Sequence, residues 1–415
     1  MIREATYYGQ WELYQTLYNR SANGDNFNKL MPLIISEDNI RLAYRHLKTN
    51  KGSKTAGIDK ETIKHVKKFG VEEFIDRVKT KFRDYNPIQV RRVYIPKKNG
   101  KMRPLGIPAF TERLCQQCIK QILEPIFESK FFKHSYGFRP GRSQHDALAR
   151  CGSLINISNC RQVIEVDIKS YFDNIDFTVL SRILWSNGIH DKELLTIIRK
   201  ILQTPIYNEG IPEKGICQGS VLSPLLSNIY LNEFDQWFAS QYEANKTLSK
   251  TLRYKSNLKA GFLVRFADDL RIFTKTKSQA RRWYHAIDQW FQQRLRLKCS
   301  KEKTRIINLK KNPTHFLGIE LKAIKKPGKK RRVCRSHIGR QELKKINNRY
   351  KAELKTLLKI HPSRFTHKLS MIASFIRGIR NYYRAATMVY SDLAKVEHRK
   401  WRLKQKLRKK HPCLK

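Results

Sequence analysis

Residues 262–273 read FLVRFADDLRIF, two apolar runs on either side of an adjacent pair of aspartates. Each run has the length and the β-branched and aromatic content of a strand, so the segment predicts an antiparallel hairpin with Asp268 and Asp269 near its turn. A polar pair between two strands is by itself an ordinary hairpin turn. Two repelling charges beside segments suited to burial indicate a functional site only if another part of the chain needs them.

A third carboxylate follows another predicted strand, in the segment VIEVDIKSYFDNID. A period of two separates its side chains into two faces, Ile164, Val166 and Ile168 on one and Val163, Glu165 and Asp167 on the other. A lone aspartate at a strand end usually caps the next turn. If the hairpin brings Asp268 beside Asp167, however, the two carboxylates suit Mg²⁺, which prefers carboxylate oxygens together with substrate phosphates. Two such ions are a known device for phosphoryl transfer.

The charge of the chain indicates a polyanionic partner. Its 415 residues include 85 Lys and Arg against 35 Asp and Glu, a net charge of +50, while 40% hydrophobic residues are typical of a globular protein. Nucleic acid and an anionic membrane surface both fit this excess. No apolar run approaches the roughly 18 residues of a membrane span, and the N-terminal MIREATYYGQW lacks the apolar core of a signal peptide. We therefore expect an intracellular protein without a membrane partner.

The eight cysteines are scattered and do not form a disulfide framework, so we expect them to be reduced. Cys115 and Cys118 form a CxxC within TERLCQQCIKQILEPIFE, but both lie on one helical face with Ile119 and Ile122. Without a second pair nearby, this spacing favours core packing over zinc or redox chemistry.

Local patterns predict several further elements. SEDNIRLAYRHLKTNKG indicates a helix with Ser36 as N-cap and Gly52 as stop signal, and a second helical stretch follows near residues 60–83. VRRVYIPKKNGKMRPLGIP predicts two strands around an Asn99-Gly100 turn. A helix is expected at residues 111–128 and another beginning near Phe177.

The later part of the chain divides by composition. Residues 241–260 are polar and predict an exposed insertion, and residues 324–335 combine Pro, Gly and a basic run, which suggests a loop or domain boundary. Residues 325–415 are helical in pattern and hold 29 basic and 4 acidic residues, a net +25. Half of the excess charge is therefore concentrated here, which indicates a dedicated binding region.

FADD resembles the aspartate-pair box of reverse transcriptases, and six other segments resemble boxes of that family in the family's order over about 230 residues. They are IPKKNGKMRPLGIPAFTERL, HSYGFRPGRSQHDAL, VIEVDIKSYFDNIDF, GICQGSVLSPLLSNIYLNEFD, LKCSKEKT and FLGIEL. GFRPGRS, the N-terminal extension and FIRGIRNYYRAA resemble the group II intron-encoded reverse transcriptases and maturases in particular.

The resemblance implies a catalytic triad of Asp167, Asp268 and Asp269. Asp167 and Asp268 bridge two metal ions, Mg²⁺ with Mn²⁺ as an alternative, and the backbone oxygen of Ile168 is a further ligand. Asp269 is the weaker contributor. Position by position, it also implies nucleotide contacts for Lys97 and Arg103, which grip the triphosphate.

Two further nucleotide contacts are implied, Phe172 beneath the sugar and Gln218 against the incoming nucleotide and the templating base. Without the aspartate boxes, Lys97 and Arg103 are simply exposed hairpin cations and Phe172 is simply core. CQGS stands where the family usually has proline, glutamine, glycine and glycine, which puts fidelity and rate in question. Phe266 replaces the commoner tyrosine before ADD.

Other positions match nucleic-acid contacts of the family. Lys303 resembles a lysine near the site, and Gly318 in FLGIEL resembles a residue of the primer-grip hairpin. In HKLSMIASFIRGIRNYYRAA, apolar residues recur at helical spacing while Arg377, Arg380 and Arg384 share another stripe. A solvated basic face is the plain interpretation of that stripe, and phosphate tracking along an RNA duplex is the functional one.

The implied fold is α+β, a right-hand polymerase with fingers and a palm built on an antiparallel sheet, followed by an α-helical thumb or maturase domain. We expect residues 1–85 to form an N-terminal extension and the start of the fingers, 86–325 the fingers and palm, and 335–415 the thumb. Because only Cys334 and Cys413 lie beyond residue 300, no HNH endonuclease domain is expected.

The implied function is an RNA-directed DNA polymerase that also binds intron RNA as a maturase for splicing and mobility. Its partners are an RNA template, intron RNA, a DNA or RNA primer and dNTPs, within a bacterial cytoplasm or an organelle. Two alternatives stay open: an RNA-binding splicing maturase with an idle polymerase site, and a domesticated reverse transcriptase in defence or repair. The sequence does not predict the oligomeric state.

Overall fold

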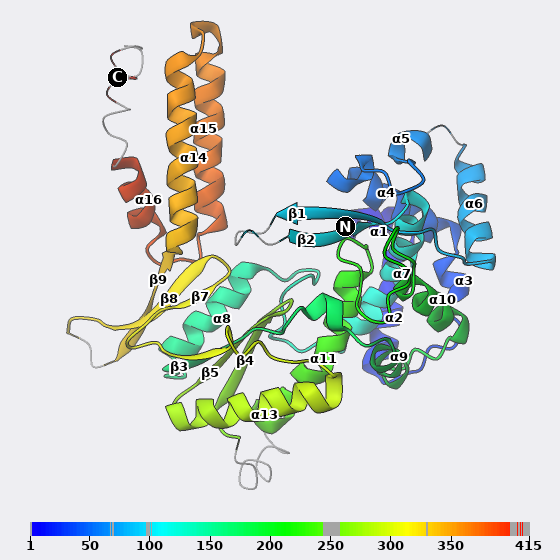
Figure 1. Ribbon diagram of the computed structural model, residues 1–415, viewed down its shortest axis with the longest axis horizontal. Helices are drawn as coiled ribbons and strands as arrows, with labels where there is room; N and C mark the ends of the chain where they lie inside the picture. Colours follow the sequence, from blue (N-terminus) through cyan, green and yellow to red (C-terminus); the bar gives the residue numbers. More distant parts are fainter. Residues whose placement is uncertain are drawn as a thin grey trace.

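The computed structural model describes residues 2–66, 68, 70–96, 100, 102–243, 258–328 and 331–398, together with 405, 407 and 409. Its strands form antiparallel sheets of two, four and three strands (Figure 1). Helices of the N-terminal half lie to one side of the four-stranded sheet, and a long helix pair projects from the other side. This mixed arrangement with antiparallel sheets confirms the predicted α+β class.

The N-terminal half is a helical layer packed around one long buried helix, α7 (Phe110–Glu128). The helices and turns before it are α1 (Ile2–Tyr7), α2 (Gln10–Ala22), α3 (Met31–Ile34), α4 (Glu37–Thr49), η1 (Lys51–Lys54), α5 (Ile63–Val66) and α6 (Val71–Arg83). The helical stretch predicted near 60–83 is therefore two helices, and α4 ends before Gly52. Cys115 and Cys118 on α7 are fully buried, as predicted from their helical face.

Ser36 lies at the N-cap of α4 but does not cap it through its side chain. Its hydroxyl donates instead to the Leu33 carbonyl oxygen at 2.9 Å. The sequence pattern located the helix start correctly and missed this competing acceptor, which the short helix α3 supplies.

The predicted strands around KKNGK are present as β1 (Arg91–Pro96) and β2 (Met102–Ile107), paired from Arg91–Ile107 to Pro96–Met102. Gly100 has a φ of +79°, as a tight turn requires. Lys97 and Asn99 lie outside the described residues.

The four-stranded sheet has the order β4-β5-β3-β6, and β3 (Gln162–Val166) is internal. Its neighbours are β4 (Gly261–Phe266), β5 (Asp269–Thr274) and β6 (Arg305–Asn308). Ile164, Val166 and Ile168 join the core shared with the N-terminal helices, whereas Val163 joins a second core. The two faces predicted for this strand are thus confirmed.

Helices cover both faces of this sheet. On one face lie α11 (Ser223–Tyr242) and α13 (Lys277–Leu295), and α8 (Gln144–Asn156) contributes to the core on the other. Between β3 and α11 the chain forms η2 (Tyr171–Asn174), α9 (Phe177–Ser186) and α10 (Lys192–Leu202). Helix α9 begins at the predicted residue because the Asp176 carboxylate accepts from the Val179 amide at 2.9 Å.

The three-stranded sheet consists of β7 (Thr314–Phe316), β8 (Ile319–Lys325) and β9 (Arg332–Ile338). Residues 324–335, predicted as a loop or domain boundary, include the end of β8 and the start of β9, paired as Ile324–Val333 and Lys325–Arg332. The loop prediction is therefore wrong for the strand residues 324–325 and 332–335, whereas residues 326–328 lie between the strands. The basic residues concealed the alternation of RRVCRSHI.

Beyond β9 the chain is helical, as predicted. Helices α14 (Arg340–Lys359) and α15 (Phe365–Tyr382) lie side by side, joined by η3 (Pro362–Arg364), and α16 (Val389–His398) packs against α14 (Figure 1). The apolar stripe of α15 is buried at Ile372 and Ile379, which confirms its amphipathic pattern. Part of the predicted insertion, residues 244–257, lies outside the described residues. No helix among the described residues is both long and apolar enough to span a membrane.

Candidate active site

The sheet brings the predicted aspartates to one edge. Strand β3 pairs with β5 up to Val166–Leu270, so Asp167 and Asp269 leave their strands at the same end, and Asp268 sits in the turn between β4 and β5. Partial desolvation raises the pKa of Asp268, and the negative charge of Asp167 raises it further. Asp167 is half-exposed and Asp268 exposed. Two mutually repelling carboxylates thus face solvent at the end of a buried sheet.

The backbone of the turn that carries Asp268 is strained, and another segment packs closely against it. Ala267 has a φ of +56°, in the left-handed region that non-glycine residues seldom occupy. Gly137 of GFRPGRS lies against it, where an added Cβ would come within 2.3 Å of the Ala267 nitrogen. A side chain at position 137 would therefore displace the turn, which explains the glycine.

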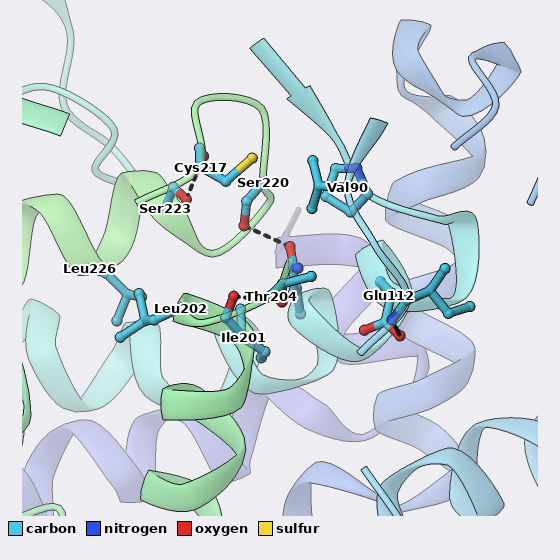
Figure 2. Close-up of a pocket in the computed structure, with 12 residues that line it drawn as sticks. Val90, Glu112, Ile201, Leu202, Thr204, Cys217, Ser220, Ser223 and Leu226 are labelled. Carbon is cyan, nitrogen blue, oxygen red and sulfur yellow. Dashed lines mark hydrogen bonds between the residues drawn. The ribbon is translucent and has the colours of Figure 1, made fainter. Parts of the chain in front are cut away.

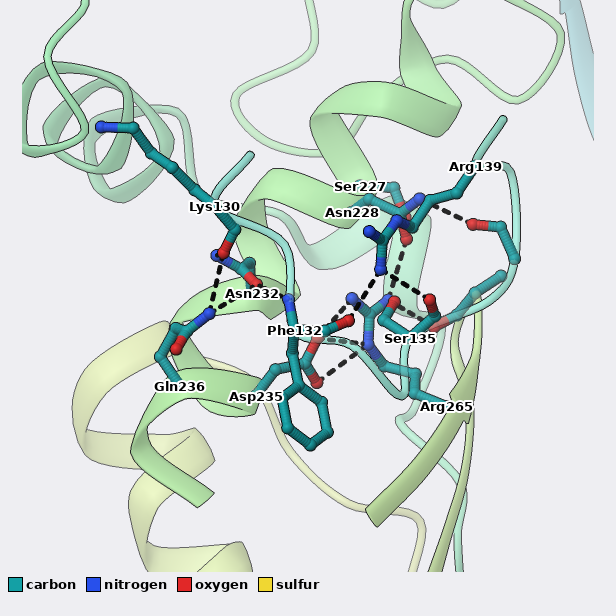
Figure 3. A network of polar contacts seen from close by, with 12 residues as sticks. Lys130, Phe132, Ser135, Arg139, Ser227, Asn228, Asn232, Asp235, Gln236 and Arg265 are labelled. Carbon is teal, nitrogen blue, oxygen red and sulfur yellow. Dashed lines mark hydrogen bonds and ion pairs between the residues drawn. The ribbon is translucent and has the colours of Figure 1, made fainter. Parts of the chain in front are cut away.

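A buried ion pair fixes the strand leading into this turn (Figure 3). Arg265 and Asp235 are both 0% exposed, and the Arg265 Nε donates to Asp235 Oδ1 and Oδ2 at 2.9 and 2.8 Å. Its Nη1 donates to Asn228 Oδ1 at 2.8 Å and to the Ala267 carbonyl oxygen at 2.9 Å. Asn228 in turn donates to the Gly137 carbonyl oxygen at 2.8 Å.

This network joins helix α11, the GFRPGRS segment and the aspartate turn into one unit. Sequence reasoning missed it. The available signal was an arginine inside an apolar strand, together with Asn228 and Asp235 seven residues apart on one helical face.

Asp269 is placed differently from Asp268. Its carboxylate forms an ion pair with Arg271 on the same strand. Burial raises the pKa of Asp269, while the Arg271 guanidinium opposes that increase. Across the described residues, no group of three or more His, Cys, Asp or Glu side chains is arranged to hold a metal ion. The cation that Asp269 contacts in this structure is thus the guanidinium of Arg271.

The segment LKCSKEKT closes over the end of β3. The Ser300 amide donates to the Asp167 carbonyl oxygen at 2.8 Å, and the Asp167 amide donates to Thr304 Oγ1 at 3.2 Å. Lys303 Nζ lies 3.3 Å from Asp167 Oδ2. Lys303 was predicted to contact nucleic acid, and in this structure its ammonium group contacts the first aspartate.

Of the residues predicted to bind the triphosphate, Arg103 is exposed on β2, and its positive charge lowers the pKa of Asp268 against the dominant desolvation. Arg103 is thus within electrostatic range of the aspartates. Lys97 cannot be located because it lies outside the described residues.

Gln218 and Gly219 lie directly against β2. The Gly106 amide donates to the Gln218 carbonyl oxygen at 2.8 Å. Gly219 has a φ of +123°, and a Cβ there would come within 2.3 Å of the Gly106 carbonyl oxygen. Only glycine fits position 219, and the contact places Gln218 beside the strand that carries Arg103.

Cys217 and Ser220, where the sequence departs from the family pattern, are accommodated by specific contacts. A Cβ on Gly106 would lie 2.1 Å from Cys217 Sγ, so the sulfur fills the space that this glycine leaves. Burial raises the pKa of Cys217 to about 11, so it is a thiol at neutral pH. Ser220 Oγ donates to Gln116 Oε1 at 2.7 Å.

These residues line a small cavity of about 20 Å³ behind the turn (Figure 2). That volume is comparable to what a single water molecule needs. The cavity is too small for a nucleotide, and Cys217 and Ser220 both line it.

Ile168 and Phe172 lie beyond Asp167 on the same segment. Ile168 is buried, whereas Phe172 is half-buried on η2 with its ring 5.4 Å from Tyr171, edge to face. The Phe172 carbonyl oxygen accepts from the Ile216 amide at 2.8 Å, so Phe172 is tied to the segment that leads into CQGS.

The remaining predicted residues are on other elements. Gly318 and Leu317, with φ values of +79° and +51°, form the turn of the β7–β8 hairpin, and Gly318 packs against Tyr383. Arg377 and Arg380 are exposed on α15, and Arg384 is exposed just after it. Arg380 lies 3.7 Å from Glu397 of α16. Arg377 and Arg380 thus share one helix, as their spacing predicted, whereas Arg384 lies beyond the end of that helix, contrary to the prediction.

Comparison with known proteins assigns the family. Residues 95–321 match the family model described as reverse transcriptase (RNA-dependent DNA polymerase). The matched region contains strands β2 to β7, which include the strands that carry the three aspartates. The chain therefore belongs to the reverse transcriptase family of RNA-directed DNA polymerases.

Two of the three relatives described next are named as intron proteins. The chain is 33% identical to protein YkfC of Escherichia coli over 67% of this chain and 79% of that protein. It is 31% identical to the group II intron-encoded protein LtrA of Lactococcus lactis subsp. cremoris, over 75% of this chain and 60% of LtrA. It is also 34% identical to a 91 kDa protein in the cob intron of Schizosaccharomyces pombe, over 53% of this chain and 28% of that protein. The chain thus spans less than two thirds of LtrA.

Proposed function

We propose that this reverse transcriptase extends a DNA or RNA primer on an RNA template with dNTPs, at a site in which Asp167 and Asp268 hold two divalent ions. The observation that carries the proposal is the meeting of these carboxylates at the solvent-facing end of the sheet, where the charge of Asp167 raises the pKa of Asp268. Repulsion of this kind is relieved by a bound cation.

The donor set fits Mg²⁺, with Mn²⁺ as an alternative. Mg²⁺ is usually bound by one or two carboxylates, with waters and substrate phosphates as the other ligands. Asp167 and Asp268 supply that number, with the Ile168 backbone oxygen as a further ligand, and Asp269 is occupied by Arg271. When bound, such ions activate the attacking hydroxyl and stabilise the leaving group.

The chain's own residues bind and orient the nucleotide. Arg103, with Lys97, grips the triphosphate as a fixed cation near the developing charge. Gln218 lies against the base pair, held at β2 by its carbonyl contact with Gly106. Phe172 contacts the sugar, where its ring excludes a ribose 2′-hydroxyl.

We assign the elements to a right-hand polymerase. The four-stranded sheet is the palm, the β1–β2 hairpin belongs to the fingers, and the helices after Ile338 are the thumb or maturase domain, with residues 1–85, 86–325 and 335–415 as the three regions. Arg377, Arg384 and Gly318 then contact the primer–template and intron RNA. The +25 charge of residues 325–415 supports binding to an RNA backbone.

The similarity to LtrA supports a group II intron type of protein, which binds its intron RNA as a maturase in splicing and mobility, inside a cell or organelle. The competing hypothesis is an RNA-binding maturase whose polymerase site is inactive. Intact Asp167 and Asp268, together with Arg103 and Gln218, support an active enzyme.

The test replaces Asp268 and Asp269 with asparagine and measures primer extension on an RNA template alongside RNA binding. We expect extension to be lost and the RNA dissociation constant to stay within about threefold of the parent. Loss of RNA binding as well assigns the pair a structural role. Absence of extension by the parent protein, with RNA binding retained, favours the splicing-only reading.

A further inference from the structure

A second buried charge cluster lies on the other face of the four-stranded sheet, within an apolar layer. Glu165 on β3 is paired across the sheet with Arg271 on β5 and Arg305 on β6. Arg271 is 8% exposed and Glu165 is 7% exposed. Their neighbours in this layer are apolar, Val163, Val264, Phe273 and Phe316. Placing charges here is costly unless their contacts serve a purpose.

The Arg271 guanidinium joins two elements. Its Nη1 is paired with the Asp269 carboxylate, and its Nη2 donates to the His315 carbonyl oxygen on β7 at 2.6 Å. The guanidinium also lies over the Phe316 ring, 5.1 Å from its centroid. One rigid group thus connects the aspartate box with the first strand of the three-stranded sheet.

Glu165 contacts the same residue of β7, His315, through its backbone amide. Its Oε1 accepts from the His315 amide at 3.2 Å and from Thr314 Oγ1 at 2.7 Å. Both backbone polar groups of His315 are therefore bound by buried side chains of opposite charge, the amide by Glu165 and the carbonyl oxygen by Arg271. His315 lies three residues before Gly318, in the hairpin predicted as the primer grip.

One donor of the Arg271 guanidinium makes no hydrogen bond within the described part of the chain. Its Nε is buried and has no hydrogen-bond partner among the described residues. An unpaired buried N–H group is unfavourable. The guanidinium therefore keeps this orientation because of its contacts with Asp269 and His315, although the orientation leaves one of its own donors unpaired.

We propose that Arg271 is a positioning residue that connects Asp269 to strand β7. Through this connection, Asp269 and the β7–β8 hairpin, predicted as the primer grip, keep a fixed relative position. The inference rests on the proposed polymerase function. It predicts that loss of the Arg271 guanidinium slows nucleotide incorporation more than it weakens primer–template binding.

The kinetic test compares Arg271→Gln, Arg271→Lys and a control, Arg305→Gln. Arg305 donates to the same Glu165 at 2.7 Å but is 59% exposed, and no contact joins it to Asp269 or His315 among the described residues. We measure kcat, the KM for primer–template and the thermal unfolding midpoint, with rates normalised to titrated active sites.

For Arg271→Gln we expect kcat to fall at least tenfold with the KM for primer–template within threefold of the parent. Arg271→Lys should recover only part of the rate, because an ammonium cannot reproduce the two-pronged contact. Arg305→Gln should remain within twofold in both parameters. A kcat within twofold of the parent for Arg271→Gln, or full recovery by lysine, overturns the proposal.

A second measurement needs neither activity nor a folded Arg271 variant. Hydrogen exchange of residues 314–316 is compared in Asp269→Asn and Asp268→Asn. Deuterium uptake should rise in Asp269→Asn and not in Asp268→Asn. The reason is that Asp269, unlike Asp268, is paired with the guanidinium that contacts His315. Equal uptake in both variants overturns the inference, whereas an inactive parent protein with this difference intact counts against the proposed function alone.

Discussion

Replacing Asp235 with asparagine tests how the aspartate turn is held. The substitution leaves Arg265 fully buried with a charge and no anionic partner. Because the asparagine amide has one acceptor oxygen in place of two, it cannot keep all three hydrogen bonds that the guanidinium donates to the carboxylate. Breaking a buried pair by removing one partner typically costs about 3–5 kcal/mol. Against a total stability of about 5–15 kcal/mol, this is a large loss.

The structure also predicts a functional effect separate from stability. Arg265 donates to the Ala267 carbonyl oxygen, so its displacement relaxes the strained turn that carries Asp268. A double variant, Asp235→Leu with Arg265→Met, replaces the pair by apolar volume and should recover most of the unfolding free energy. Because it cannot hold Ala267 or Asn228, it should still extend primers at least tenfold more slowly than the parent.

Urea unfolding followed by tryptophan fluorescence measures the first effect. Trp283 is fully buried and its ring lies 4.2 Å from that of Phe238, on the helix that carries Asp235. A loss below about 1 kcal/mol for Asp235→Asn would show that Arg265 finds other compensation. Parent-like activity of the double variant would remove the pair from the support of the turn.

Three further predictions concern the turn, the nucleotide side and the helical region. Because the pKa of Asp268 is raised in the folded state, its favourable contribution is present below the ordinary aspartate value of about 3.9 and is lost as pH rises through the raised value. Asp268→Asn should therefore raise the thermal unfolding midpoint at pH 7 but not at pH 3, and Mg²⁺ should stabilise the parent more than the variant; a gain independent of pH contradicts this. Gly219→Ala should raise the KM for dNTPs at least tenfold because of the contact with Gly106, whereas Gly210→Ala, with positive φ but nothing within 4 Å, should change it less than threefold. Neutralising Arg377, Arg380 and Arg384 should flatten the salt dependence of RNA binding by up to about one phosphate per residue, with the smallest share from Arg380 because of Glu397; an unchanged slope removes them from the interface.

The hairpin and the strand before Asp167 were predictable because period-two patterns and turn residues are local signals. The same holds for the buried CxxC face and for the amphipathic α15. These features need only a few neighbouring residues to be recognised. The strand β9 was missed because its alternation is carried by basic residues, which a search for apolar periodicity does not detect.

The supports of the candidate site were not predictable in the same way. Arg265, Asn228 and Gly137 act together across a strand, a helix and a loop. The hydrogen bond from Arg271 to the His315 carbonyl oxygen depends on how two sheets pack. No local pattern specifies such contacts. The sequence offered a charged residue inside an apolar strand as a signal at both Arg265 and Arg271.

The central claim is that Asp167 and Asp268, 101 positions apart in the chain, form one metal-dependent catalytic site. The most direct measurement is Mg²⁺-dependent primer extension by Asp167→Asn, Asp268→Asn and the double variant, with RNA binding measured in parallel. One shared site predicts that each single variant loses nearly all extension, that the double variant is no worse, and that RNA binding persists. Substantial extension by either single variant, or additive losses in the double variant, would contradict the account.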